Sequence, residues 1–225
     1  MTSAKKQRRP TIPPPHQPKS TKQRRTNVAS ILVLGSLVAL TFIVLATRSN
    51  SAGDGKTSAA GYAIGNPGPG AKAPDFSLPS TSGGTVHLSD YRGKTVLLFF
   101  HEGIGCQPCW DQIRDLENVP ASLASSGIDK LLTITSGPTR LIAQKMADEN
   151  LTSIALGDTN LDISKTYNAN QYGMMGDSRD GHSFVLVGPK GFIEWRADYG
   201  GPPKYTMYVP VEKILSDLKT GRVGA

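Results

Sequence analysis

Apolar and polar positions change their pattern along the chain, and the longest apolar run comes first. Residues 28–47, VASILVLGSLVALTFIVLAT, contain no charged side chain. A helix of about 20 such residues is long enough to cross the ~30 Å hydrocarbon core of a bilayer. The run therefore predicts a transmembrane helix near the N-terminus.

From residue 71 to about residue 220, short apolar runs alternate with helical spacing. Residues 95–100, TVLLFF, form a continuous apolar run, as expected for a strand buried on both faces. Two short alternating pieces around Gly83 and Gly84 predict a hairpin before this strand. Further strands are expected at 131–135, 153–157, 183–187 and 192–197, and helices after Cys106 and at 139–150, 162–168 and 209–221. This order predicts an α/β layer structure whose strands are parallel at first and end in an antiparallel hairpin.

The two cysteines of the chain lie at the start of the first of these helices. Cys109, Ile113 and Leu116 follow one another at i, i+4 and i+7, the spacing of a helix with one buried face. Cys106 is therefore expected at the helix N-terminus, where unpaired N–H groups and the helix dipole lower the pKa of a thiol below its free value of about 8.5. Cys106 is the expected nucleophile, and Cys109 is the expected resolving thiol.

The spacing of the cysteines favours reversible dithiol chemistry over a structural role. Residues 105–110, GCQPCW, hold both of them, and a disulfide that closes so short a loop stabilises a fold very little. A zinc site would need about four ligands, and the sequence contains no second CxxC. We therefore expect a redox-active pair that needs no metal and no organic cofactor.

Basic residues are concentrated before the apolar run. Eight of the 25 Lys and Arg residues, and none of the 18 acidic residues, lie in the first 27 positions, which accounts for the formal net charge of +7. Membrane topology and anionic lipid explain such a segment, so we expect no nucleic-acid partner. The charge bias predicts a cytoplasmic N-terminus and a domain outside the cytoplasm, held at the cell membrane.

These patterns divide the chain into a basic, proline-rich cytoplasmic tail (1–27), a single-pass transmembrane anchor (28–47), a flexible linker (48–70) and one domain (71–220). The linker is predicted from its Gly, Ser, Ala and Pro content. The alternative to an anchor is a signal peptide that is cleaved near SNSA at 49–52, but the apolar region of a signal peptide is only about 7–15 residues long.

Four stretches of the domain resemble thioredoxin-fold redoxins: APDFSL at 73–78, LSDYRGKTVLLFF at 88–100, CQPC at 106–109 and FVLVGPKGFIEW at 184–195. The chain resembles membrane-anchored redoxins of the TlpA/ResA type within the alkyl hydroperoxide reductase/thiol-specific antioxidant group. The resemblance implies a thioredoxin-like mixed sheet flanked by helices. It also implies an extracytoplasmic thiol–disulfide oxidoreductase that acts on protein thiols or disulfides, or on small thiol or peroxide substrates.

The chain departs from the thioredoxin pattern at the positions that dock a partner. Gly105 stands directly before the first cysteine, where thioredoxins carry a tryptophan, and Trp110 follows the second cysteine. Gly181 takes the place of the cis-proline beside which thioredoxin-fold proteins bind an extended peptide. Trp110 and Gly181 are therefore the candidate substrate-docking residues, with ordinary core packing as the alternative for Trp110.

The chain also lacks the family's buried acid in the strand before the active site. The strand at 95–100 ends in LLFF, so His101 or Glu102 is expected to serve as the proton acceptor. His182 is a third candidate modulator, because a protonated imidazole beside Cys106 would lower the pKa of that thiol. The alternatives are a surface turn for His182 and an ordinary strand end for His101.

A thiol peroxidase is one alternative function for the same cysteines. In that reaction Cys106 would form a sulfenic acid before the disulfide closes. The peroxiredoxin pattern Pro-x-x-x-Thr-x-x-Cys is absent, since Phe99 and Gly103 occupy the Pro and Thr positions.

A copper-binding metallochaperone is the other alternative. Copper-delivery relatives of the fold bind the metal through two cysteines and a histidine from a distant loop, which here would be Cys106, Cys109 and His182. Met174 and Met175 are expected to be packing residues and not copper ligands.

The anchor predicts where the full-length chain is found. Because residues 28–47 are long enough to span a bilayer and basic residues precede them, membrane fractions are expected to contain the uncleaved chain, and a reporter fused after Ala225 is expected to be active only outside the cytoplasm. Cell fractionation and N-terminal sequencing measure this. Recovery of a soluble form that begins near Ala52 would identify a cleaved signal peptide.

Overall fold

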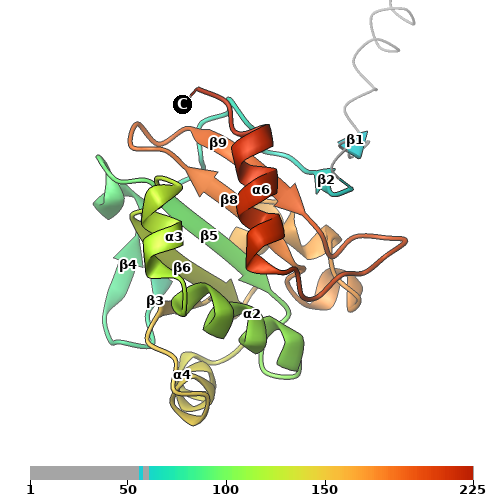
Figure 1. The fold of residues 1–225 in the computed structure, drawn as a ribbon. Helices are drawn as coiled ribbons and strands as arrows, with labels where there is room; N and C mark the ends of the chain where they lie inside the picture. Colours follow the sequence, from blue (N-terminus) through green and yellow to red (C-terminus); the bar gives the residue numbers. More distant parts are fainter. Residues whose placement is uncertain (1–55, 58–60, 225) are drawn as a thin grey trace, which may run out of the picture. The chain divides into compact units, whose positions relative to one another are not determined.

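A seven-stranded mixed sheet organises the described part of the chain (Figure 1). The computed structural model describes residues 56–57 and 61–224, so the expected tail and transmembrane anchor (1–47) lie outside the described residues. The strands of this sheet are β1 Lys56–Thr57, β2 Ala63–Ile64, β5 Val96–His101, β6 Lys130–Thr135, β7 Ile154–Gly157, β8 Ser183–Val187 and β9 Ile193–Asp198. No helix within the described residues is long and apolar enough to cross a membrane.

The strand directions confirm the order expected from the sequence. The sheet runs β1-β2-β9-β8-β5-β6-β7, in which β5, β6 and β7 are parallel and β8 is antiparallel to both β5 and β9. The expected hairpin around Gly83 and Gly84 is also present. Its strands, β3 Ser77–Pro79 and β4 Thr85–His87, form a separate two-stranded sheet.

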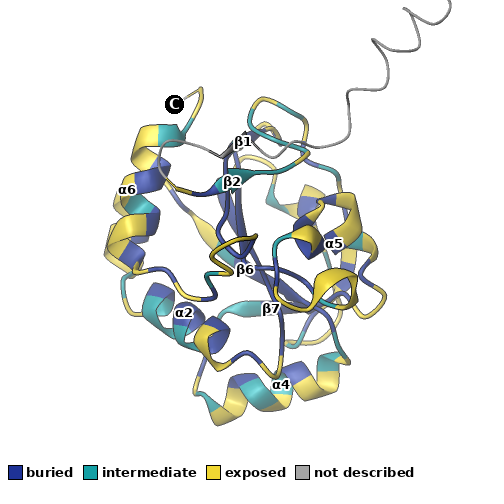
Figure 2. Cartoon of the chain, turned by 90° about the vertical axis from the view of Figure 1, so that its right-hand side faces the viewer, coloured by how far each residue is buried: buried dark blue, intermediate teal, exposed yellow. Residues whose placement is uncertain are grey.

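Strand β5 lies inside the sheet, and all six of its residues are buried. Successive side chains of a strand point to opposite faces, so Leu97 and Phe99 join one hydrophobic cluster while Leu98 and Phe100 join another. Figure 2 shows the buried strands between helices whose outer sides are exposed. The continuous apolar run at 95–100 thus reflects layers packed on both faces of the sheet.

Helices and the small hairpin form those layers. The helices are α2 Gln107–Glu117, α3 Pro120–Ser125, α4 Thr139–Asp148, α5 Asp162–Thr166 and α6 Val211–Gly221, with 3₁₀ turns at Leu88–Tyr91, Ala169–Gln171 and Gly176–Ser178. Side chains from α2, α3, α4 and α6 pack on the face that includes Phe99. Side chains from β3 and from the segment after α5, among them Leu78 and Tyr167, pack on the opposite face with Phe100.

The domain begins earlier than the boundary expected at residue 71. Ala63 of β2 pairs with Asp198 of β9, and the buried ring of Tyr62 packs edge-to-face on Trp195, with the ring centroids 6.1 Å apart. Residues 61–70 therefore belong to the domain, and their assignment to the flexible linker 48–70 was wrong. Their Gly- and Pro-rich composition gave no indication of a partner strand so far along the chain.

A fully buried ion pair fixes this first segment to β9. Arg196 donates from Nε to Asp198 Oδ2 at 2.8 Å and from Nη2 to Oδ1 at 3.0 Å. The backbone N–H of Gly65 also donates to Asp198 Oδ2 at 2.7 Å, and Arg196 Nη1 donates to the Pro67 carbonyl at 3.0 Å. The guanidinium carbon lies 5.7 Å from the centroid of the Tyr172 ring. These contacts supply the hydrogen bonds that a buried charge pair requires.

Replacing Arg196 by Met is expected to lower the free energy of unfolding by about 3–5 kcal/mol, because Asp198 would remain buried without its counter-ion. The double variant Arg196→Met/Asp198→Leu, which removes both charges, is expected to lose much less. Denaturant unfolding of the three proteins measures the difference. Equal losses in the single and double variants would show that the charge pairing is not what holds this segment.

Candidate active site around the cysteine pair

The end of β5 and the start of α2 place the two cysteines at one end of the sheet. Cys106 is the residue immediately before α2, and its carbonyl accepts the N–H of Cys109 at 3.0 Å. A disulfide joins the two side chains. The structure thus confirms that the pair follows a buried strand and begins a helix with a buried face.

The two sulfur atoms differ in their access to solvent. Cys106 is 7% exposed, whereas Cys109 is completely buried. Met207, from the connection between β9 and α6, forms a small buried cluster with the cysteine pair. Cys106 is therefore the more accessible of the two residues, although it is less exposed than the sequence suggested.

A cavity of about 310 Å³ opens beside Cys106. Three segments of the chain line it, and their lining residues are Glu102, Gly105, Cys106 and Pro108 near the start of α2, Met174, Met175 and Arg179 before β8, and Met207 after β9. Met174 and Met175 are 58% and 55% exposed, so their interpretation as packing residues was wrong. Sequence reasoning also missed Arg179 and Met207, because only the folding of distant loops brings them to the cysteines.

Glu102 is the one carboxylic acid among the described residues that line this cavity. The residue is buried, and its carboxylate accepts the backbone N–H of Met174. This hydrogen bond joins the segment before α2 to the loop that carries the two exposed methionines. Of the candidate modulators, Glu102 is the one that faces the cavity with Cys106.

His101 and His182 lie in the core instead. Both are completely buried and both contact the ring of Phe99, whose centroid is 5.3 Å from that of His101 and 4.8 Å from that of His182. Burial lowers the pKa of each imidazole to about 3, so both rings are neutral at pH 7. The interpretations of His182 as a surface-turn residue, or as a protonated partner of Cys106, were therefore wrong.

Trp110 is a core residue and not a docking surface. Its side chain is completely buried, and its Nε1–H donates to the Gly103 carbonyl at 3.1 Å. Gly103 has a φ of +91°, a conformation that favours glycine. The tryptophan thus holds the turn that leads into Cys106, which is the packing alternative considered for it.

Gly181 is buried and cannot present its backbone to a partner peptide. Its N–H already donates to the Ala169 carbonyl at 3.0 Å, and the next N–H, of His182, donates to the Tyr172 carbonyl at 2.8 Å. A Cβ atom at position 181 would overlap the Tyr172 carbonyl oxygen. Glycine is needed here because two backbone segments approach closely, and the docking role expected for Gly181 was wrong.

The copper site considered as an alternative, with Cys106, Cys109 and His182 as ligands, is not formed. Within the described residues, no three His, Cys, Asp or Glu side chains are grouped so that they could hold a metal ion. The ring of His182 instead packs edge-to-face on Phe184, with the centroids 5.5 Å apart.

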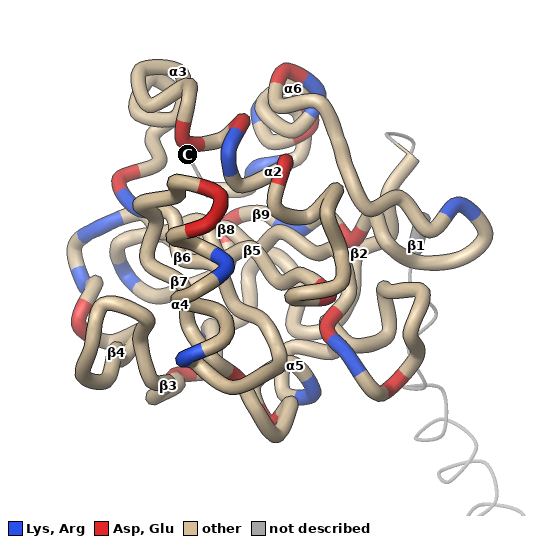
Figure 3. Tube along the Cα trace, turned by 90° about the horizontal axis from the view of Figure 1, so that it is seen from below, with Lys and Arg blue, Asp and Glu red and all other residues tan. Residues whose placement is uncertain are grey.

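A polar network holds the first residue between the cysteines. The Gln107 amide donates to Asp111 at 3.2 Å and to Glu149 at 3.1 Å, and it accepts a hydrogen bond from Lys145 at 2.9 Å. Lys145 Nζ also lies 6.0 Å from the centroid of Trp110. Helix α4 therefore contacts the cysteine turn through its polar side. Elsewhere, acidic and basic positions are interspersed over the described domain (Figure 3).

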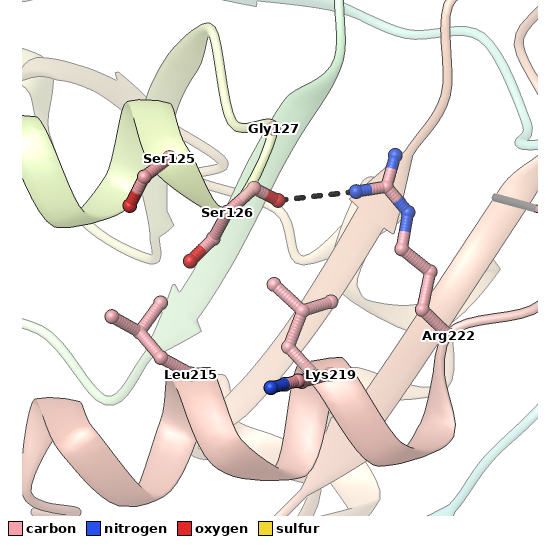
Figure 4. Close-up of a pocket in the computed structure, with 7 residues that line it drawn as sticks. Ser125, Ser126, Gly127, Leu215, Lys219 and Arg222 are labelled. Atoms are coloured by element: carbon pink, nitrogen blue, oxygen red, sulfur yellow. Dashed lines mark hydrogen bonds between the residues drawn. The ribbon is translucent and has the colours of Figure 1, made fainter.

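A larger cavity, of about 520 Å³, lies between α3 and α6 (Figure 4). Its lining residues are Ser125, Ser126, Gly127, Leu215, Leu218, Lys219 and Arg222. The Arg222 guanidinium donates to the Ser126 carbonyl at 3.1 Å across this cavity. Because its lining contains no cysteine, histidine or carboxylic acid, we place the candidate active site at the smaller cavity beside Cys106.

The chain is similar to known proteins over much of its length. Residues 69–196 match the family described as "AhpC/TSA family". A putative peroxiredoxin of Mycobacterium tuberculosis is 29% identical over 101 residues, which are 45% of this chain and 64% of the relative. The thiol-disulfide oxidoreductase ResA of Geobacillus thermodenitrificans is 29% identical over 127 residues, or 56% of this chain and 65% of the relative. The matches thus span just under two-thirds of the length of these curated relatives.

Solved structures share the fold. Peroxidoxin BcpB of Mycobacterium tuberculosis superposes with a TM-score of 0.57 at 16% identity, covering 68% of this chain and 97% of that chain. A putative thiol:disulfide interchange protein DsbE of Chlorobium tepidum gives a TM-score of 0.52 at 20% identity, covering 68% and 96%. At these identities the likeness shows the fold alone, and it confirms the thioredoxin-like mixed sheet with flanking helices.

The buried imidazoles predict loss of stability in acid. Burial depresses the folded-state pKa of His182 to about 3, so its contribution to stability is complete above the unfolded pKa of about 6.5 and is lost as the pH falls toward 3. On going from pH 7 to pH 4.5, protonation of His182 in the unfolded state should lower the free energy of unfolding by about 2–3 kcal/mol. We expect His182→Leu to remove that part of the difference between unfolding free energies at the two pH values.

The parent protein, unfolded at the same two pH values, is the reference for this comparison. If His182→Leu kept the full pH difference, the imidazole would not be held neutral in the folded state.

Proposed function

The chain belongs to the AhpC/TSA family, and on that premise we propose that it is a thiol–disulfide oxidoreductase in which Cys106 and Cys109 cycle between dithiol and disulfide. One observation carries this proposal above the others. The chain's only two cysteines form a disulfide at the start of α2, beside a cavity that reaches Cys106. Relatives in the family are named both as thiol–disulfide oxidoreductases and as peroxiredoxins, so reversible cysteine oxidation is common to them.

In the first step, the Cys106 thiolate attacks a substrate disulfide. A bond forms between Cys106 Sγ and one substrate sulfur while the substrate S–S bond breaks, and the other substrate sulfur leaves as a thiolate. The N-terminus of α2 favours the thiolate form of Cys106. Arg179, the one basic residue among the described residues that line the cavity, adds a positive charge there.

In the second step, Cys109 resolves the mixed disulfide. Its thiol loses a proton, its sulfur bonds to Cys106 Sγ, and the substrate leaves as a second thiol. Two electrons have then passed from the enzyme to the substrate, and the reverse sequence oxidises a substrate dithiol. We assign the proton transfer to Glu102, because it is the carboxylic acid of the cavity lining while His101 and His182 are neutral and in the core.

Thiol peroxidase activity is the second candidate, and the names of the peroxiredoxin relatives favour it. The residues that occupy the Pro and Thr positions of the peroxiredoxin pattern, Phe99 and Gly103, do not support peroxidase activity. Phe99 packs face-to-face on Phe184 in the core, with the ring centroids 4.5 Å apart, and Gly103 has no side chain with which to bind a peroxide. We therefore place disulfide exchange first.

We also propose that the enzyme is anchored in the cell membrane and acts outside the cytoplasm. The support is the uncharged run at 28–47, which follows a tail of eight basic residues. Its substrates would then be thiols or disulfides on that side of the membrane, where cysteine pairs are oxidised more readily than in the cytoplasm.

The two cysteines are expected to fail in different ways when replaced. Cys106→Ser should abolish turnover of insulin or a model disulfide, because no nucleophile remains at the cavity. Cys109→Ser should accumulate mixed disulfides on Cys106, which non-reducing gels and mass spectrometry detect. Turnover that survives in Cys106→Ser would overturn the proposal, and a rate with hydrogen peroxide far above that with disulfides would favour the peroxidase.

Glu102→Gln is expected to slow the resolving step about tenfold or more and to change its dependence on pH, because general base catalysis requires a carboxylate. Rapid-mixing measurements at several pH values follow this step. Glu212→Gln, at an exposed position in the first turn of α6, serves as the control. An unchanged pH profile in Glu102→Gln would remove the acid from the mechanism.

A further inference from the structure

The sulfur atoms of the chain are concentrated at one place in the fold. The sequence contains two cysteines and five methionines. Met207 forms a small buried cluster with the disulfide-bonded cysteines, and it lines the cavity beside Cys106 together with Met174 and Met175. Of the other two methionines, Met1 lies outside the described residues and Met146 packs in the main core cluster.

The three methionines at the site have two kinds of position. Met207 is buried and packs directly on the cysteine pair, so its thioether belongs to the wall of the site. Met174 and Met175 project from the loop before β8 and are more than half exposed. The hydrogen bond from the Met174 N–H to Glu102 holds that loop at the edge of the cavity. Apolar packing explains Met207, but it does not explain two adjacent methionines exposed to solvent.

We propose that the reduced site binds one Cu(I) ion through the thiolates of Cys106 and Cys109 and the thioether of Met207, and that Met174 and Met175 capture the ion at the entrance. Thiolate and thioether sulfurs are the soft ligands that select Cu(I). Zinc sites require about four ligands, usually including imidazole or further thiolates, and the cavity lining contains no histidine and no third cysteine.

These proposed ligands differ from the two cysteines and one histidine that bind copper in the copper-delivery relatives of the fold. His182 is buried among aromatic rings, and the grouping it would need is not present in the described residues. A thioether from the connection between β9 and α6 supplies the third ligand in its place. The site therefore consists of sulfur alone.

Binding transfers no electrons. Cu(I) replaces the two thiol protons, which pass to solvent, and the metal keeps its oxidation state. The disulfide form has no thiolate to offer, so oxidation of the pair and metal binding exclude each other. The inference rests on the proposed function only in requiring that the Cys106–Cys109 disulfide can be reduced.

The test is a titration of the full-length chain in detergent, reduced and desalted without oxygen, with Cu(I) in competition with bicinchoninate. We expect one Cu(I) per chain in the reduced form and none in the disulfide form. Met207→Leu should weaken Cu(I) binding at least about tenfold, because replacing residues that only hydrogen-bond to metal ligands already weakens metal binding by about that factor. Leu keeps the apolar packing, and Met146→Leu, in the main core, is the matched control that should bind as the parent does.

X-ray absorption of the copper-loaded protein gives an independent reading, with three sulfur neighbours expected in the parent and two in Met207→Leu. Affinity that is unchanged in Met207→Leu, binding by the disulfide form, or nitrogen neighbours in the absorption spectrum would overturn the proposal. Disulfide turnover is measured on the same preparation. A protein that exchanges disulfides but binds no Cu(I) retains the proposed function and loses only this inference.

Discussion

The buried ion pair between Arg196 and Asp198 is the interaction on which most of the arrangement depends. Asp198 holds the first segment of the domain through the N–H of Gly65, and Arg196 lies against the Tyr172 ring. Tyr172 in turn accepts the N–H of His182 at the start of β8, and it opens the loop that carries the exposed methionines. Two charges taken out of water are tolerated only where their hydrogen bonds are satisfied. Here those bonds fix the start of the domain to β9, and the ring contact with Tyr172 extends the arrangement to the loop before β8.

The cysteine site is built from short-range parts on that frame. Burial of β5 on both faces fixes where the strand ends, and the Trp110 indole closes the turn that follows through the carbonyl of Gly103. The end of β5 and this turn together place Cys106 at the N-terminus of α2, beside the cavity. The proposed redox chemistry needs little more, because Glu102, Cys106 and Cys109 all lie between positions 102 and 109 of the sequence. The other side chains of the cavity wall, those of Met174, Met175, Arg179 and Met207, come from the loops before β8 and after β9.

This division explains how much of the structure the sequence could predict. The strands, the helices and the position of the cysteine pair follow from local periodicity, and the family resemblance pointed to the same fold. The surroundings of the site did not follow, because they depend on contacts between distant residues. Gly181 is glycine because the Tyr172 carbonyl approaches it, and His182 is neutral because Phe99 and Phe184 enclose it. Residues 61–70 resembled a linker because their partner strand lies more than 130 positions away.

The short strands at the beginning of the domain have a consequence for how the molecule meets other chains. An exposed sheet edge is a template for strand addition and for aggregation. At one edge, β1 and β2 are two residues each and cover β9; at the other, β7 is only four residues long, and Ser80 bridges to it at Leu156. Within the described residues, neither edge is a long strand with a row of free backbone groups, and the backbone at Gly181 is already paired. The proposed substrates would therefore meet side chains rather than free backbone groups, and the exposed, flexible side chains of Met174 and Met175 suit contacts with varied surfaces.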